Sequence, residues 1–239
     1  MPIQQSAIRN RLLAALPAAD FAALVDHLQP AELELKQVLQ EPGQTIRSIY
    51  FPEGGVVSQV ALLENGHNVE VGVVGREGLV GLPALLGAER AVTEAMVQME
   101  GSAWRIRPGE LRSAFERSAS LRALLLRYVQ AIYAQIVQTA ACNAQHAVDM
   151  RLARWLLMMH DRAEQDEFLM THEFLALMLG AHRPSISVAA AVLQKAGVVR
   201  YVRGQITVLD RAGLEAASCE CYGVVREQFD GLLGVPAGK

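Results

Sequence analysis

The sequence predicts an α+β protein in which one long helix joins an N-terminal β-roll to a C-terminal winged helix-turn-helix. Short apolar strands alternate with glycine-containing turns between residues 31 and 107, as in a β-sandwich or jelly roll. A helical spacing of apolar residues begins at about residue 120, and two short helices followed by a β-ribbon occupy residues 171–208. The expected units are a β-roll with N-terminal helices (1–118), a long dimerisation helix with a hinge (119–145), and the winged module with a helical extension (146–239).

Composition and charge agree with this division. Of the 239 residues, 51% are hydrophobic and 20% are charged, which is typical of a chain with a packed core. The net charge of −3 gives no signal for nucleic acid over the whole chain. Residues 171–211, however, carry a net charge of +3, so the remainder carries −6. A basic module on an acidic body is the pattern expected of a DNA-binding domain.

The first 30 residues have a helical pattern. Ile8, Leu12 and Leu16 share one face, and Pro17 ends the run. Asp20 is expected to cap a second short helix that continues to about residue 28. We interpret these helices as a lid packed on the next domain.

The β-roll is predicted from strands of regular length between turn signals. Turns are expected at 41–43, 52–55 and 65–66, where glycine follows proline, glutamate or asparagine. The expected strands are 32–35, 48–51, 56–63, 69–74, 92–99 and 102–106.

The long helix carries an apolar stripe with a spacing of three and four residues. Such a near-heptad seam predicts a partner helix and hence a homodimer. The alternative is that the stripe packs only on the chain's own β-domain. Residues 143–146 interrupt the stripe and are expected to form a hinge. The predicted dimerisation residues are Leu121, Leu124, Leu125, Tyr128, Ile132, Ile136 and Thr139.

The winged module is predicted from the residues that end and begin its helices and strands. A first helix ends at Gly180, and Pro184 lies in the first turn of a second helix, where its missing N–H is tolerated. Strands at 198–202 and 205–208 follow, joined through Arg203 and Gly204. Residues 211–229 suggest one further helix against the module.

The three cysteines do not form a recognisable framework. The chain has an odd number of cysteines, Cys142, Cys219 and Cys221, which argues against a disulfide scaffold. Reduced thiols in a cytosolic protein are therefore expected. They are too few for an all-cysteine iron–sulfur cluster. Because no histidine lies near Cys219 and Cys221 in the sequence, no metal site is expected there. With neither a signal-peptide pattern nor an apolar run as long as a membrane span, the expected location is cytoplasmic, with no membrane partner.

The order of these parts resembles the Crp/Fnr family of bacterial transcription regulators. The resemblance covers nearly the whole chain and rests on Gly75-Arg-Glu-Gly-Leu-Val-Gly81, Glu89-Arg90, Arg151-Leu-Ala-Arg154 and residues 171–208. It implies a cyclic-nucleotide-binding-like roll and a homodimeric regulator that binds double-stranded DNA in a sequence-specific way. It also suggests RNA polymerase as a partner.

The resemblance places an effector site in the roll, with important departures. In the best-known members a glutamate takes a ribose hydroxyl, but Leu79 stands at that position. Ala91 replaces the small hydroxyl residue that follows the phosphate-binding arginine, and Ile136 and Val137 replace two adenine contacts. Cyclic AMP is therefore not expected, and the effector is left open between another small molecule, cyclic di-GMP, a protein partner and none. The effector-site positions are Gly78, Leu79, Val80, Gly81, Arg90, Ala91 and Gln135.

Haem and iron–sulfur sensing are not expected either. A haem would need an axial ligand such as His67, and a histidine in a turn is usually solvated. Of the family's three base-reading positions, only the first keeps its type, as Arg183; Pro184 and Val188 occupy the other two. The operator should therefore differ from the family's best-known one. The predicted DNA contacts are Thr171, His182, Arg183, Ser185, Ser187, Arg200, Tyr201 and Arg203.

Two other classes of function are an enzyme and a ligand-sensing protein that does not bind DNA. An enzyme is not expected, because the sequence contains neither a nucleophile elbow, nor a P-loop, nor a His/Glu metal box. The remaining alternative is a ligand- or cyclic di-GMP-sensing protein whose winged module mediates protein contacts.

Overall fold

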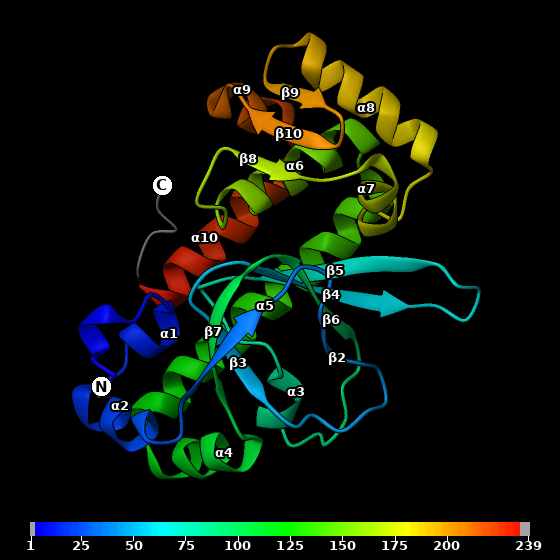
Figure 1. Ribbon diagram of the computed structural model, residues 1–239. Helices are drawn as coiled ribbons and strands as arrows, with labels where there is room; N and C mark the ends of the chain where they lie inside the picture. Colours follow the sequence, from blue (N-terminus) through cyan, green and yellow to red (C-terminus); the bar gives the residue numbers. More distant parts are fainter. Residues whose placement is uncertain (1–2, 235–239) are drawn as a thin grey trace.

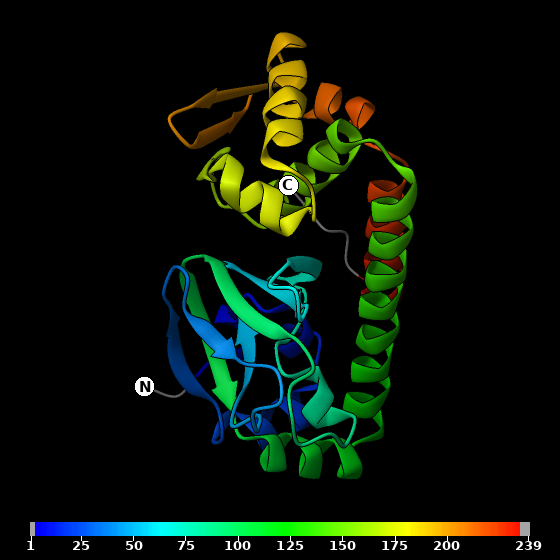
Figure 2. The ribbon, with the colours of Figure 1, turned by 90° about the vertical axis from the view of Figure 1, so that its right-hand side faces the viewer.

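The computed structural model describes residues 3–234, so the outermost parts of two predicted units, residues 1–2 and 235–239, lie outside the described residues. A β-roll lies at one end and a winged module at the other, and the long helix α5 (Ala119–Gln145) runs along both (Figures 1 and 2). This is the predicted architecture. Within residues 3–234 no single helix is long and apolar enough to cross a membrane; only α7 and α8 taken together, with a bend of 107° between them, meet that test.

The N-terminal segment forms the expected lid. It contains a 3-10 turn (Gln5–Ala7) and the helices α1 (Arg11–Ala14) and α2 (Ala18–Val25). Asn10 caps α1 by accepting from two backbone N–H groups, while its amide donates to the carbonyls of Pro52 and Gly78. Because this fully buried side chain joins lid and roll, its removal leaves several polar groups unpaired. The expected cap Asp20 lies inside the first turn of α2 instead.

The roll consists of two antiparallel sheets whose inner faces share one core. Leu33 and Phe51 from the first sheet meet Val57 and Val97 from the second. The short strand β2 was not predicted, because a run of three residues is too short to show an alternation of polar and apolar positions. In order across each sheet, the strands are β1 (Gln29–Leu33), β7 (Gly101–Ile106) and β3 (Ile49–Pro52), then β2 (Val38–Gln40), β6 (Glu94–Met99), β4 (Val56–Leu62) and β5 (Asn68–Val74).

The second sheet is buried on both faces. Val56, Val60 and Val73 point away from the roll's core and join the core of the winged module, together with Trp155. The module is therefore packed on the roll through an apolar contact. Two short helices, α3 (Leu82–Leu85) and α4 (Pro108–Arg117), complete the roll and lead into α5.

The apolar stripe that predicted dimerisation faces the chain's own roll. Six of its seven residues are buried within the chain, and only Ile136 is exposed. The assignment of these six residues to a partner helix is therefore wrong, and for them the alternative of packing on the chain's own domains holds, whereas the predicted role of Ile136 remains a prediction. The physical reason is that a helix covering a sheet has the same three-and-four spacing as a coiled-coil seam. The buried six are Leu121, Leu124, Leu125, Tyr128, Ile132 and Thr139.

The winged module begins after a break in the helix. His146 and Ala147 are extended, so the helix breaks at the last residue of the predicted hinge, whereas residues 143–145 still belong to α5. The module holds the three-stranded sheet β8-β10-β9, of which β8 was not predicted. Its elements are α6 (Val148–His160), β8 (Glu167–Leu169), α7 (His172–Met178), α8 (Arg183–Lys195), β9 (Val199–Val202) and β10 (Gln205–Val208).

The C-terminal extension forms two helices rather than one. The first, α9 (Arg211–Ala217), packs on the module, as expected. The second, α10 (Cys221–Leu233), turns back and lies alongside α5 (Figure 2). Val225 and Phe229 of α10 belong to the core of the roll and α5. The expectation that the whole extension packs on the module is wrong for α10.

Candidate nucleic-acid interface and effector pocket

The helices α7 and α8 form a helix-turn-helix. Their bend of 107° lies in the range that this motif requires. Thr171 caps α7 by accepting from the N–H of Phe174 at 3.2 Å, as predicted. Gly180 adopts a φ of +54° in the turn, a conformation that favours glycine. The sequence therefore defines both ends of the first helix locally.

Arg183 lies at the start of α8 and is largely exposed. Its Nε lies 2.6 Å from Oε1 of Glu173 on α7, and both side chains are 63% exposed. An exposed ion pair of this kind is weak, so the guanidinium remains available to a stronger anion or to a guanine edge.

The outward face of α8 is otherwise apolar. Val188 is 66% exposed, and Val192 and Pro184 also lie on the surface. With Ser185 and with Asp149 of α6, they line a shallow groove. Apolar side chains on a groove-reading helix contact thymine methyl groups rather than hydrogen-bonding base edges.

Two predicted DNA contacts have partners within the module. The hydroxyl of Ser187 lies 2.9 Å from Nδ1 of His172, and the hydroxyl of Tyr201 donates to the carbonyl of Met170 at 3.0 Å. The rings of His172 and Tyr201 stack at 4.4 Å. Burial, together with the nearby Arg183 charge, lowers the pKa of His172, so this ring is neutral near pH 7. These groups hold α7, α8 and the wing together.

The wing presents cations to solvent. Arg200 and Arg203 are both exposed, and His182 is exposed at the N-cap of α8. Arg203 and Gly204 have φ values of +51° and +82°, which make the two-residue loop a type I′ turn. The structure thus places Arg183, Arg200 and Arg203 on the surface of one module.

The predicted effector site of the roll is filled by the chain's own side chains. A Cβ atom at Gly78 would overlap the phenol ring of Tyr128, and the Tyr128 hydroxyl donates to the carbonyl of Leu79 at 3.0 Å. Leu79, Val80 and Ala91 are buried in the core.

Gln135 and Arg90 are used in a similar way. Gln135 is fully buried and pairs with both the N–H and the carbonyl of Val73, at 3.0 and 3.1 Å. The guanidinium of Arg90 donates to the carbonyl of Gly43 at 2.6 Å and is exposed. In this structure the side chains of Arg90 and Gln135, which were expected to contact an effector, are hydrogen-bonded to backbone groups of Gly43 and Val73 instead.

A buried carboxylate joins the roll to the module and was missed by sequence reasoning. Glu70 of β5 accepts from Nε1 of Trp155 on α6 at 2.9 Å, and also from Ser58 and from Gln98. Burial raises the pKa of Glu70 to about 7. In the sequence, Glu70 is one polar residue in an alternating strand, a pattern that normally predicts solvent exposure.

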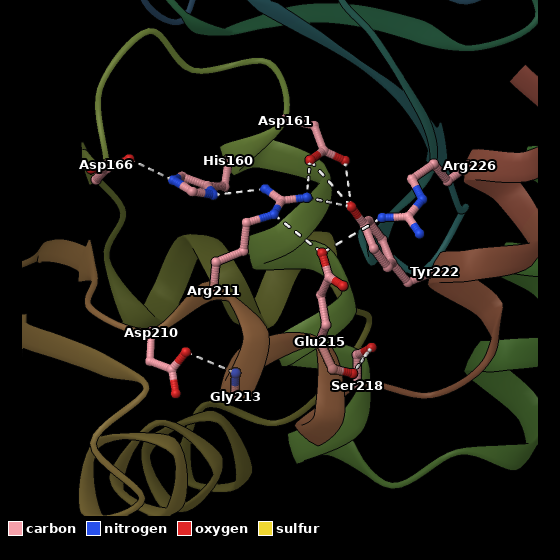
Figure 3. Close-up of polar contacts among 10 residues, drawn as sticks. All are labelled: His160, Asp161, Asp166, Asp210, Arg211, Gly213, Glu215, Ser218, Tyr222 and Arg226. Atoms are coloured by element: carbon pink, nitrogen blue, oxygen red, sulfur yellow. Dashed lines mark hydrogen bonds and ion pairs between the residues drawn. The ribbon is translucent and has the colours of Figure 1, made fainter. Parts of the chain in front are cut away.

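Charged groups add to this contact. Nη2 of Arg162 lies 2.7 Å from Oε1 of Glu77 in the roll, and both side chains are only 10% exposed. Within the module, Arg211 contacts His160, Asp161, Glu215 and Tyr222, and so joins α9 and α10 to the end of α6 (Figure 3). The module, α9 and the start of α10 are thereby linked.

Comparisons with known proteins agree with this architecture. The cyclic nucleotide-binding domain family matches residues 30–118, and the Crp-like helix-turn-helix domain family matches residues 150–217. The transcriptional regulator LdrP of Thermus thermophilus is 32% identical over 193 residues, which cover 75% of this chain and 92% of LdrP.

Solved structures share the fold at lower identity. FixK2 from Bradyrhizobium japonicum superposes with a TM-score of 0.69 at 16% identity, covering 80% of this chain and 98% of FixK2. A CRP-family transcriptional regulator from Thermus thermophilus gives a TM-score of 0.64 at 24% identity, covering 79% of this chain and 96% of the other.

Proposed function

Because the chain belongs to the Crp/Fnr family of transcription regulators, we propose that it is a homodimer that binds DNA sequence-specifically through α8. The observation that carries this proposal is the set of arginines that the winged module exposes on its surface. Arg183 lies at the exposed start of α8, and the wing cations Arg200 and Arg203 belong to the same compact unit. Arg183 suits a guanine, whereas the wing arginines suit phosphates.

The dimer is proposed to form through the face of α5 that points away from the roll. Seven of its exposed residues have a spacing of three and four, which is the heptad pattern of a coiled-coil seam. Tyr133 is 61% exposed, an unusual exposure for a large aromatic side chain in the middle of a long helix. The proposed seam consists of Ala123, Leu126, Gln130, Tyr133, Val137, Ala140 and Ala144.

A selection from random double-stranded DNA tests the DNA-binding proposal. The wild-type protein should enrich a two-fold repeat whose half-sites lie about one helical turn apart. Arg183→Ala should lose preference at one base position, with a loss of about tenfold or more in affinity for the selected site. Arg203→Ala should weaken all sequences alike and reduce the salt dependence.

Arg47→Ala, at an exposed arginine of the roll, is the matched control and should bind as the wild type does. No enrichment by the folded wild-type protein would contradict the proposal. It would favour the alternative in which the winged module contacts proteins.

Analytical ultracentrifugation tests the dimer. Tyr133→Glu places a charge in the middle of the proposed seam and should convert dimers to monomers, because burying an unpaired charge is costly. Val92→Glu makes a similar change at an exposed loop residue of the roll and should leave the dimer intact. A Tyr133→Glu variant that stays dimeric would exclude this seam.

We also propose that cyclic AMP is not the effector. This proposal is supported by Tyr128, which packs against Gly78 and donates to the carbonyl of Leu79, and by Gln135, which is buried and accepts from the N–H of Val73. Native mass spectrometry of the purified dimer should therefore detect no bound cyclic AMP, and adding it should not raise the melting temperature. Stoichiometric binding would overturn this reading of the roll. RNA polymerase remains a proposed partner of the DNA-bound dimer.

A further inference from the structure

Three cysteines and one histidine, far apart in the sequence, meet where α10 begins against the last turns of α5. Cys142 lies in the last turn of α5 and His146 directly follows that helix, while Cys219 and Cys221 flank the start of α10. Their four ligand atoms all lie within 4.8 Å of one another. The three thiols are 1%, 3% and 0% exposed, and they include every cysteine of the chain.

We propose that these four residues bind one zinc ion. A tetrahedral zinc with three thiolates and one imidazole has Zn–S bonds of about 2.3 Å, which place neighbouring sulfurs about 3.8 Å apart. Sγ of Cys142 and Sγ of Cys219 are 3.5 Å apart, and Sγ of Cys221 lies 3.4 Å from Nδ1 of His146. These separations fit a single metal centre.

The same distances disfavour an iron–sulfur cluster. A four-iron cluster binds each protein ligand through a different iron, so its thiolates stand farther apart than they do around one ion. Cys₃His is a donor set typical of structural zinc sites, which have no open coordination position. A structural rather than a catalytic ion is therefore inferred.

Polar groups around the four ligands are arranged as they are around a metal site. Nε2 of Gln138 donates to Sγ of Cys221 at 3.0 Å. Nε2 of His146 lies 3.4 Å from a carboxylate oxygen of Glu220, which leaves Nδ1 directed at the sulfurs. A carboxylate on the far nitrogen of a ligating histidine fixes the ring and its tautomer.

Two buried arginines offset the charge. Zinc with three thiolates carries a net charge of −1, which needs compensation in a buried place. The guanidinium of Arg151 interacts electrostatically with Cys142 and Cys219, and that of Arg154 interacts with Cys142. Among residues 3–234, Nε of each arginine has no hydrogen-bond partner. These cations lie where they would offset the negative charge of a zinc–thiolate centre.

The position gives the ion a mechanical role. The ion would cross-link α5, next to the break at His146, to the start of α10. Because Arg211 already joins α9 and α10 to α6, zinc would complete a closed connection between the long helix and the winged module. Loss of the ion would free this connection.

Metal analysis of the full-length protein, purified under reducing conditions without a metal-affinity tag, tests the site. We expect about one zinc per chain. Replacing zinc with cobalt should give the visible bands of a tetrahedral cobalt–thiolate site. Cys219→Ser and His146→Ala should each lower the zinc content at least tenfold, whereas His67→Ala, at an exposed turn histidine, should keep it.

A second measurement does not depend on the folding of variants. In the wild-type protein the three thiols should resist alkylation until a chelator removes zinc, and added zinc should restore protection. Metal-free wild-type protein that takes up neither zinc nor cobalt would overturn the proposal. So would a Cys142–Cys219 disulfide in protein isolated under reducing conditions, or an iron–sulfur absorption spectrum. None of these measurements requires DNA binding. The zinc site can therefore be supported or refuted independently of the proposed function.

Discussion

Glu70 shows how a single residue can make the contact between roll and module depend on pH. Its carboxyl group is buried among Ser58, Gln98 and Trp155, and burial raises its pKa to about 7 from an ordinary value near 4.5. Between these values the folded protein keeps a proton that the unfolded chain has lost. The stabilising contribution is therefore fully present below about pH 4.5 and is lost as pH rises through 7, by about 3 kcal/mol in total.

Glu70→Gln should remove this dependence. The amide can still accept from Trp155, and its N–H can donate to Oε1 of Gln98, a buried atom without a partner among residues 3–234. Urea unfolding at several pH values should show the variant gaining stability over the wild type as pH rises from 5 to 8. A constant difference between the two proteins would show that Glu70 does not titrate in this range.

We expect Glu173 to weaken the proposed contact of Arg183 with DNA. The two side chains form an exposed ion pair at 2.6 Å, and the carboxylate would lie close to DNA phosphates. Glu173→Gln should raise DNA affinity by about threefold to tenfold and change stability by less than about 0.5 kcal/mol, because exposed pairs contribute little. Fluorescence anisotropy at two salt concentrations measures the first effect, and chemical denaturation measures the second.

The matched control is Glu34→Gln, at an exposed glutamate of the roll. It removes the same charge from the chain at a distance from α8. Equal gains from both variants would mean that net charge, rather than the pair with Arg183, sets the affinity.

At the scale of elements, the sequence was sufficient to predict a helix or turn wherever residues within that segment fix its backbone conformation. Gly180, Pro184 and the Arg203-Gly204 turn mark the winged module because each needs a particular backbone conformation. It was insufficient for α5, on which both the face toward the roll and the opposite face carry apolar residues at helical spacing. Which face meets a partner depends on where the roll packs, and that is a long-range property.

Site residues follow the same rule. Arg183 and the wing arginines could be proposed from the sequence because they lie close together in it, whereas Glu70 and the cysteine–histidine cluster could not. Cys142 and Cys219 are brought together only because α10 turns back along α5. Motifs of residues close together in the sequence cannot reveal a ligand set that forms only when α10 packs back along α5.

The helix α10 should contribute strongly to stability despite its terminal position. Phe229 is buried against the roll and α5, so Phe229→Ala should destabilise the protein by about 3–5 kcal/mol through lost contacts and a cavity. Val224→Ala, at an exposed position of the same helix, should cost less than about 1 kcal/mol. Thermal or urea unfolding measures both changes in stability. If Phe229→Ala cost as little as Val224→Ala, α10 would be only loosely attached to the roll and α5.

At the scale of the whole molecule, the ion pairs between roll and module include a buried pair and an exposed pair within residues 3–234. Glu77 and Arg162 are buried, whereas Arg9 and Glu164 are largely exposed at a separation of 2.6 Å. Removing one partner of a buried pair leaves an uncompensated charge, while removing one partner of an exposed pair leaves a solvated one. The two pairs thus form a natural comparison.

Arg162→Met should destabilise the protein by about 3–5 kcal/mol, and Arg9→Met by less than about 1 kcal/mol. Adding Glu77→Gln to Arg162→Met should recover part of the loss, because the buried carboxylate is then neutral. Glu77→Gln also keeps an acceptor for the N–H of Gly75. A double-mutant cycle with no coupling between positions 77 and 162 would show that the pair is not formed in solution.

The return of α10 to α5 has a consequence for synthesis of the chain. The last described helix completes the core of the first domain, and Arg11 near the start lies 4.0 Å from Asp230 near the end. A growing chain therefore cannot complete this core until α10 has left the ribosome. Any product released early would carry an uncovered apolar face on α5, which is the kind of surface that quality-control proteases and chaperones recognise.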